Sequence, residues 1–103
     1  GRSFTDQFTI SPNYGSLVAL MRIAGPGTIT GTATWEGTPA NLALIINGPG
    51  QVGYYARQDG PTGLTVEYNV TGGDFAAGDQ WRLSVVAFEP PNVTQGTLNV
   101  WYP

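Results

Sequence analysis

Residues 28–35 read Thr-Ile-Thr-Gly-Thr-Ala-Thr-Trp, a strict alternation of threonine with an apolar residue or glycine. Successive side chains of a β-strand point to opposite faces, so this pattern predicts a strand with one buried face and one hydroxyl-bearing face. The same period of two recurs in Leu64–Val70, Trp81–Val85 and Leu98–Val100. Together the four segments predict an all-β protein.

Further segments complete the set of strands. Leu17–Ile23 and Leu42–Ile46 are apolar at nearly every position, which predicts central strands covered on both faces. Phe4–Ile10 and Gln51–Arg57 bring the number of predicted strands to about eight, and Gly73–Asp79 predicts one short helical turn. Glycine and proline supply turns between them. We therefore expect a single antiparallel β-sandwich, jelly-roll or immunoglobulin-like.

The composition excludes several kinds of chemistry. The 103 residues include no histidine and no cysteine, which removes the commonest general base, the usual zinc and haem ligands, and disulfides. Only 11% of residues are charged and the net charge is −3, so neither nucleic acid nor an anionic membrane is an expected partner. The seven acidic residues are scattered. We expect no catalytic residues, no cofactor and no enzyme.

The order of motifs in residues 28–103 carries a family resemblance. Thr-Trp-Glu-Gly at residues 34–37 precedes a Leu-x-Leu strand and a Gly-Pro-Gly turn at residues 41–50. A Gly-x-x-Trp strand follows at residues 78–85, and a Gly-Thr-Leu-x-Val strand closes the chain at residues 96–100. This order resembles the bacterial pre-peptidase C-terminal (PPC-like) β-sandwich domains. The resemblance implies a secreted, non-catalytic module used for binding or attachment.

Calcium binding is the weakest of the functions considered. Calcium-binding members of that family carry acidic residues before the Leu-x-Leu strand, where this chain has Thr38 and Asn41. Asp74 and Asp79 offer oxygen ligands, which calcium prefers, but without an Asp-x-Asp spacing. No metal site is therefore expected, and a calcium-dependent adhesion domain stays a third alternative.

The first sixteen residues set this chain apart from an appended binding module. Phe4, Phe8 and Ile10 alternate with polar residues, and a Ser-Pro-Asn-Tyr-Gly-Ser break follows. Such an extension resembles the N-terminal donor strand of pilus subunits built by donor-strand exchange, in which the strand of one subunit completes the sandwich of another. We therefore divide the chain into a donor strand and linker, residues 1–16, and a β-sandwich domain, residues 17–103.

This second resemblance predicts a structural subunit of an extracellular bacterial fibre at the cell surface, whose partner is another copy of the chain. Leu17, Leu98 and Val100 are expected to line the acceptor groove. A head-to-tail contact of this kind does not close on itself, so it gives a filament. The same pattern also fits an ordinary first strand of the chain's own sheet, and both alternatives stay open at this point.

The main alternative function is a carbohydrate- or matrix-binding module of a secreted protein. Neighbouring residues of a strand point to opposite faces, so one ring of the pair Tyr54-Tyr55 is exposed, and one of Trp101-Tyr102. We expect Tyr55 and Trp101, with Arg57, to form a surface on which sugar rings stack. Contacts between subunits would use the same residues.

Two Asn-x-Thr tripeptides begin at Asn69 and Asn92, near predicted turns. N-linked glycans attach to this tripeptide in secreted proteins. Together with the threonine-lined strand faces, they leave an attached sugar coat as a further alternative.

Overall fold

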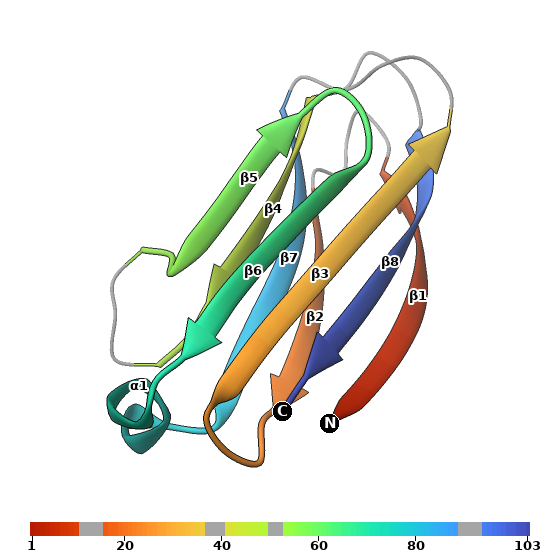
Figure 1. Cartoon of the computed structure of the whole chain (residues 1–103). Helices are drawn as coiled ribbons and strands as arrows, with labels where there is room; N and C mark the ends of the chain where they lie inside the picture. Colours follow the sequence, from red (N-terminus) through yellow and green to blue (C-terminus); the bar gives the residue numbers. More distant parts are fainter. Residues whose placement is uncertain (11–15, 37–40, 50–52, 89–93) are drawn as a thin grey trace.

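A computed structural model of the chain describes residues 1–10, 16–36, 41–49, 53–88 and 94–103. These residues form eight strands and one short helix (Figure 1). In chain order the elements are β1 (Arg2–Ile10), β2 (Ser16–Arg22), β3 (Gly27–Glu36), β4 (Asn41–Asn47), β5 (Ala56–Gly60), β6 (Leu64–Val70), α1 (Gly72–Ala77), β7 (Gln80–Phe88) and β8 (Thr94–Tyr102). The prediction of a single antiparallel β-sandwich with about eight strands is confirmed.

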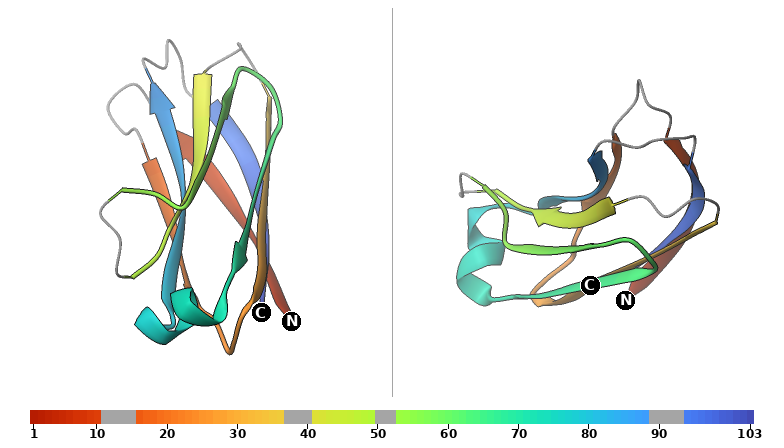
Figure 2. Two further views of the ribbon diagram at one scale, coloured as in Figure 1. Left: turned by 60° about the vertical axis from the view of Figure 1, so that its left-hand side comes forward. Right: turned by 90° about the horizontal axis from the view of Figure 1, so that it is seen from above.

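Two four-stranded antiparallel sheets make up the sandwich, and Figure 2 shows them as facing layers. The strand order is β1-β8-β3-β6 in one sheet and β2-β7-β4-β5 in the other. Each sheet combines strands from both halves of the chain, which is the arrangement of an eight-stranded jelly roll. Both termini lie at the same end of the sandwich as α1 (Figure 1).

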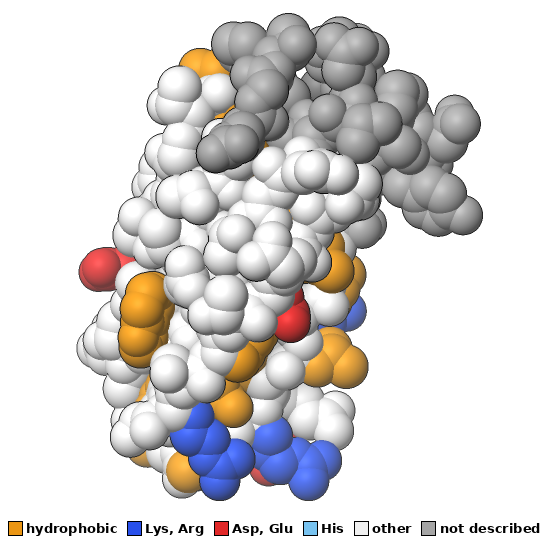
Figure 3. All heavy atoms as spheres, turned by 90° about the vertical axis from the view of Figure 1, so that its right-hand side faces the viewer, with side chains coloured by type: hydrophobic (Ala, Val, Ile, Leu, Met, Phe, Trp, Pro, Cys, Tyr) orange, Lys and Arg blue, Asp and Glu red, His pale blue; other side chains and the backbone are white. Residues whose placement is uncertain are grey.

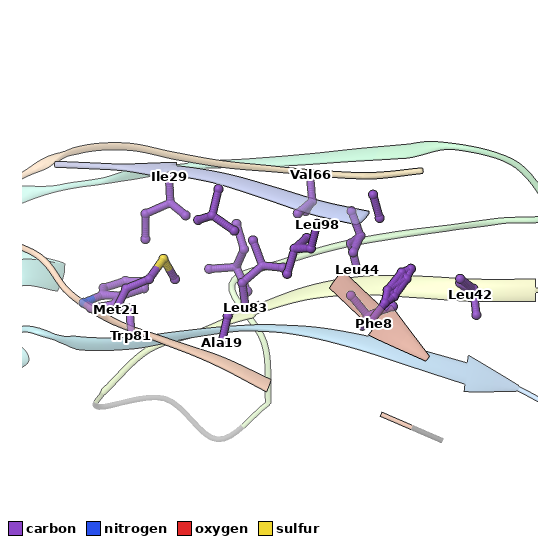
Figure 4. Packing of buried hydrophobic residues seen from close by; sticks show 14 of the residues in the cluster. Phe8, Ala19, Met21, Ile29, Leu42, Leu44, Val66, Trp81, Leu83 and Leu98 are labelled. Carbon is purple, nitrogen blue, oxygen red and sulfur yellow. The ribbon is translucent and has the colours of Figure 1, made fainter. Parts of the chain in front are cut away.

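The core lies between the sheets, where alternate side chains of the strands meet (Figure 4). β5 contributes the partly buried Ala56. Ile29 and Ala33 of β3 are completely buried, as their phase predicts. Gly31 lies between them and faces Leu83 of the other sheet, whose side chain occupies the space that a Cβ would need. A glycine in the middle of this strand therefore makes room for a leucine from the facing layer.

One of the two strands predicted to be central is an edge strand. Leu42–Ile46 does fall in a central strand, because β4 pairs with both β5 and β7. The prediction for Leu17–Ile23 is wrong, because β2 pairs with β7 alone and ends its sheet. Val18 and Leu20 on its outer face are 49% and 76% exposed. An apolar run predicts burial of both faces but cannot show whether a neighbour covers the second one.

Two local predictions met different outcomes. The strand predicted at Gln51–Arg57 is shifted toward the C-terminus. In the structure the fifth strand is Ala56–Gly60, which pairs with β4. Residues 51 and 52 lie outside the described part of the chain. The helical turn expected at Gly73–Asp79 is present as α1. Thr71 caps it, and Asp74 completes a reciprocal capping box with the Thr71 backbone N–H.

Candidate functional site

The N-terminal strand β1 pairs with β8 of the same chain over its whole length, from Arg2 opposite Tyr102 to Ile10 opposite Thr94. In the single chain the predicted donor strand is therefore the first strand of its own sheet, and the sandwich includes residues 2–10 as well as residues 17–103. Exchange of this strand between subunits involves more than one chain, so it stays a prediction.

The inward side chains of β1 are part of the hydrophobic core. Phe8 is 3% exposed and Ile10 is 1% exposed. Phe4 is half-buried at the opposite end of the strand and packs edge-on against Tyr102, with ring centroids 5.9 Å apart. Asp6 shares their phase but remains exposed, so it interrupts the apolar face without being buried. Without β1 the core would lack two fully covered side chains and one rim aromatic.

The ring of Phe8 fits into a gap in β8 that is left by a glycine. Phe8 lies opposite Gly96 in the ladder. A Cβ at Gly96 would overlap both the Phe8 ring and the carbonyl oxygen of Thr34 on the other neighbouring strand. Only glycine at this position therefore leaves room for the ring. Gly96 was named only as part of the closing strand motif and not as a site residue, although a glycine inside an alternating strand is a signal of close approach.

The structure brings two of the three predicted groove residues next to β1. Val100 lies opposite Phe4 and Leu98 lies opposite Asp6, and both are completely buried. Leu17 is on β2 in the facing sheet, half-buried against the core. Gly96, Leu98 and Val100 of β8 thus lie beside β1 as its ladder partners, and we call the place that β1 occupies next to them the β1 groove.

An open hollow lies between the two edge strands β1 and β2. Phe4 and Asp6 line it on one side, and Val18, Ala19 and Leu20 on the other. Figure 3 views the molecule from the β1 side, where hydrophobic side chains lie around an acidic one and arginines gather at one end. The strand edges at this side of the sandwich have no neighbour in the single chain.

The predicted aromatic surface is not formed by the expected residues. The choice of Tyr55 as an exposed ring is wrong, because Tyr55 packs between Tyr68 and Trp81 with centroids 4.9 and 4.7 Å away. Its hydroxyl donates a hydrogen bond of 2.8 Å to the carbonyl oxygen of Pro49. Tyr54 is the exposed member of the pair, and its ring lies 5.9 Å from the Arg57 guanidinium.

Trp101 is 48% exposed, but on the opposite layer from Arg57. Trp101 belongs to β8 in the first sheet, whereas Arg57 belongs to β5 in the second. The structure therefore separates the two residues that were expected to share a sugar-binding surface. Trp101 lies on the outer face of β8, between Ser3 of β1 and Thr30 of β3.

The acidic residues considered for calcium are engaged in other interactions. Asp74 accepts a hydrogen bond of 3.0 Å from the Thr71 backbone N–H and one of 2.7 Å from the Tyr68 hydroxyl. The hydrogen bond from Thr71 has the larger effect and the one from Tyr68 the smaller, and both lower the pKa of Asp74. The Asp74 carboxylate in turn raises the pKa of Tyr68 to about 12. Asp79 lies 3.7 Å from Arg22. Within the described ranges, no three acidic residues cluster as a metal site would require.

The candidate glycosylation sites differ in what the structure describes. Asn69 is exposed on β6, on the same outer face as Trp101. Asn92 lies outside the described residues. Among the described elements, no helix is long and apolar enough to cross a membrane.

Comparison with known proteins extends the fold assignment. No protein-family model matches the sequence, and no curated protein matches it either. The crystal structure of the Yersinia pseudotuberculosis-derived mitogen is similar, with a TM-score of 0.69 and 18% identity over 99% of this chain and 86% of that chain. A family two carbohydrate esterase from Cellvibrio japonicus aligns with a TM-score of 0.34 and 14% identity, over 95% of this chain and 33% of that chain. The first likeness shows a shared β-sandwich fold and nothing about function, and the second is too low to support an argument.

Proposed function

We propose that the protein is a non-catalytic structural subunit of an extracellular fibre, in which β1 of one copy completes the sandwich of the next. The observation that supports this most is the fit of the Phe8 ring into the hole at Gly96. Because this pocket fixes the register of the strand, a β1 strand from another copy would bind in the same position as the chain's own β1.

The position of β1 at the edge of its sheet makes exchange feasible. All of its ladder partners are on β8, so β1 can leave without breaking any other strand pair. A β1 from a neighbouring copy would restore the same register and bury the same side chains. Burial of Phe8 and Ile10 contributes about 3–6 kcal/mol before the cost of ordering the strand. Because this gain is the same in both arrangements, exchange has a low thermodynamic cost.

The length of the connection limits how the copies can be arranged. Residues 11–15 join the end of β1 to the start of β2. An extended chain advances at most about 3.6 Å per residue, so the six steps from Ile10 to Ser16 span roughly 20 Å. Exchanging copies must therefore meet at the end of the sandwich where β1 ends. Passing β1 always to the next copy gives an open filament, whereas reciprocal exchange gives a closed dimer.

The composition of β2 is consistent with burial in an assembly. Edge strands of monomeric proteins are commonly protected by charges or proline, which discourage pairing with other chains. β2 has no proline and a single charge, the exposed Arg22 at its end, and Leu20 is 76% exposed. The exposed apolar side chains continue the hollow beside β1, so a neighbouring copy that donates β1 would also lie close to them.

Removal of β1 and its replacement by a peptide test this function. A chain lacking residues 1–12 should melt at a lower temperature than the full chain and expose the β1 groove. A peptide of residues 2–10 should raise the melting temperature again, and a matched peptide with Gln7→Ala should do the same because Gln7 points outward. A peptide with Phe8→Ala should have little effect.

Electron microscopy of the full-length chain supplies the second part of the test. We expect filaments whose formation is abolished by the deletion and by Phe8→Ala. A truncated chain that melts like the full one and ignores the peptide would contradict exchange. Full-length protein that forms only monomers or closed dimers would contradict the fibre.

A further inference from the structure

The outer face of the β1-β8-β3-β6 sheet is polar and nearly without charge. Its outward residues are mainly threonine, asparagine, glutamine and serine, and among those whose side chains the structure describes Glu67 is the one that is charged. They are Ser3, Thr5, Gln7 and Thr9 of β1, Gln95, Thr97, Asn99 and Trp101 of β8, Thr28, Thr30, Thr32 and Thr34 of β3, and Thr65, Glu67 and Asn69 of β6.

Trp101 is the single large aromatic side chain among these outward residues, and hydroxyl groups flank it on both sides. In the ladders it lies opposite Ser3 of β1 and opposite Thr30 of β3. An open depression beside the ring is lined by Arg2, Ser3, Thr28, Trp101 and Pro103, among others. The indole N–H has no hydrogen-bond partner within the described part of the chain. Both the ring and its donor are therefore accessible to a ligand.

The next row of the sheet holds a fixed hydrogen-bonding group. Asn99 is two residues before Trp101 on the same face of β8 and lies between Thr5 and Thr32. The Thr5 hydroxyl donates a hydrogen bond of 2.7 Å to the side-chain carbonyl of Asn99. This contact orients the side chain and leaves its NH₂ group to donate elsewhere.

These groups match the chemistry of a sugar chain. A pyranose ring presents C–H groups on its face, which pack on an aromatic ring, and hydroxyls at its edges, which pair with amide and hydroxyl groups. Among the outward side chains that the structure describes on this face, Glu67 is the one charged group, and Arg2 is the cation that lines the depression beside Trp101. We propose that this face binds a neutral polysaccharide, with Trp101 under a sugar ring and Asn99 donating to a sugar hydroxyl.

This inference goes beyond the fibre role and does not depend on strand exchange. The residues at the centre of the face belong to β8 and β3. Ser3 and Thr5 occupy the same register whether β1 comes from the same chain or from a neighbour. In a fibre, the site would repeat along the assembly and multiply a weak affinity.

Binding to defined polysaccharides tests the site. We would measure depletion of the full-length protein by swollen cellulose and by chitin, and its titration with soluble mannan, with alginate as an anionic comparison. At least one neutral polymer should bind and alginate should not. Trp101→Ala should weaken binding at least about tenfold, which corresponds to about 1.4 kcal/mol. Trp101→Phe should retain most of the affinity, and Asn99→Ala should lose several-fold.

Tyr54→Ala is the matched control, since Tyr54 is also an exposed aromatic side chain but lies between β4 and β5, away from this sheet. It should leave sugar binding unchanged, and thermal melting should show that every variant is folded. Failure of all three neutral polymers to bind would overturn the proposal, as would equal binding by Trp101→Ala and the unmodified protein. If Trp101→Ala reduced self-association and left sugar binding intact, the face would be a contact between copies and the proposal would be wrong.

Discussion

Replacement of Phe8 by alanine probes how much β1 contributes to the sandwich. The ring is 3% exposed and fills the hole at Gly96, so its loss removes a nearly complete burial and leaves a cavity. Phe→Ala substitutions in cores cost about 3–5 kcal/mol. Because β1 is an edge strand that can shift inward, we expect the lower end, about 3 kcal/mol. That is a large part of the 5–15 kcal/mol typical of a whole domain.

The assay is urea unfolding followed by the fluorescence of the three tryptophans, with thermal melting in parallel. A loss of about 3 kcal/mol corresponds to a fall in melting temperature of about 12 °C or more for a domain of this size. Gln7→Ala, one residue away on the exposed face of β1, is the control and should stay within about 0.5 kcal/mol of the unmodified protein. If Phe8→Ala cost less than about 1 kcal/mol, the ring in the β1 groove would not hold the strand.

Three further predictions follow from individual contacts. Gly96→Ala should destabilise the protein by about 1–3 kcal/mol in urea unfolding, because its Cβ overlaps the Phe8 ring and a backbone carbonyl, whereas Gly25→Ala meets no atom within 4 Å and should be neutral. The folded-state pKa of Asp74 is below its ordinary 3.8, so its contribution to stability is present above pH 3.8 and is lost as the pH falls through the lowered value. In melts against pH, Asp74→Asn should remove that part of the acid sensitivity, and an unchanged profile would contradict the assignment. The Tyr68 pKa is raised from 10.0 to about 12, so its contribution is present below pH 10 and is lost as the pH rises through about 12. Tyr68→Phe should abolish this alkaline loss, and tyrosinate absorbance showing an unshifted Tyr68 would refute it.

Much of the fold could be predicted because burial follows a period of two. The phase of Thr28–Trp35 identified the inward residues of β3, and the alternation of Phe4, Phe8 and Ile10 identified those of β1. The sequence pattern did not predict which strands lie next to one another in a sheet. The apolar run in β2 gave no sign that its sheet ends there, since exposure of Leu20 depends on which strand lies beside it.

The candidate site was harder to predict for the same reason. Tyr54 and Tyr55 had to face opposite ways, but the period alone cannot say which side faces the core. The hole at Gly96 depends on a pairing between the two ends of the chain, with Phe8 and Gly96 on β1 and β8. Local sequence carries no record of such a distant partner, so the glycine could be read only as an interruption of the strand.

The most direct measurement of strand exchange uses the absence of cysteine in the chain. Gln7 and Thr97 lie opposite each other on the outer face of β1 and β8, so a Gln7→Cys/Thr97→Cys variant can form a disulfide across this pair. Thr32→Cys/Thr65→Cys joins β3 to β6 and is the control, because that pair stays within one chain in either arrangement. On a denaturing gel without reductant, filaments of the first variant should give a ladder of covalent multimers, and the control only monomers. Filaments whose first variant also runs as a monomer would show that each chain keeps its own β1.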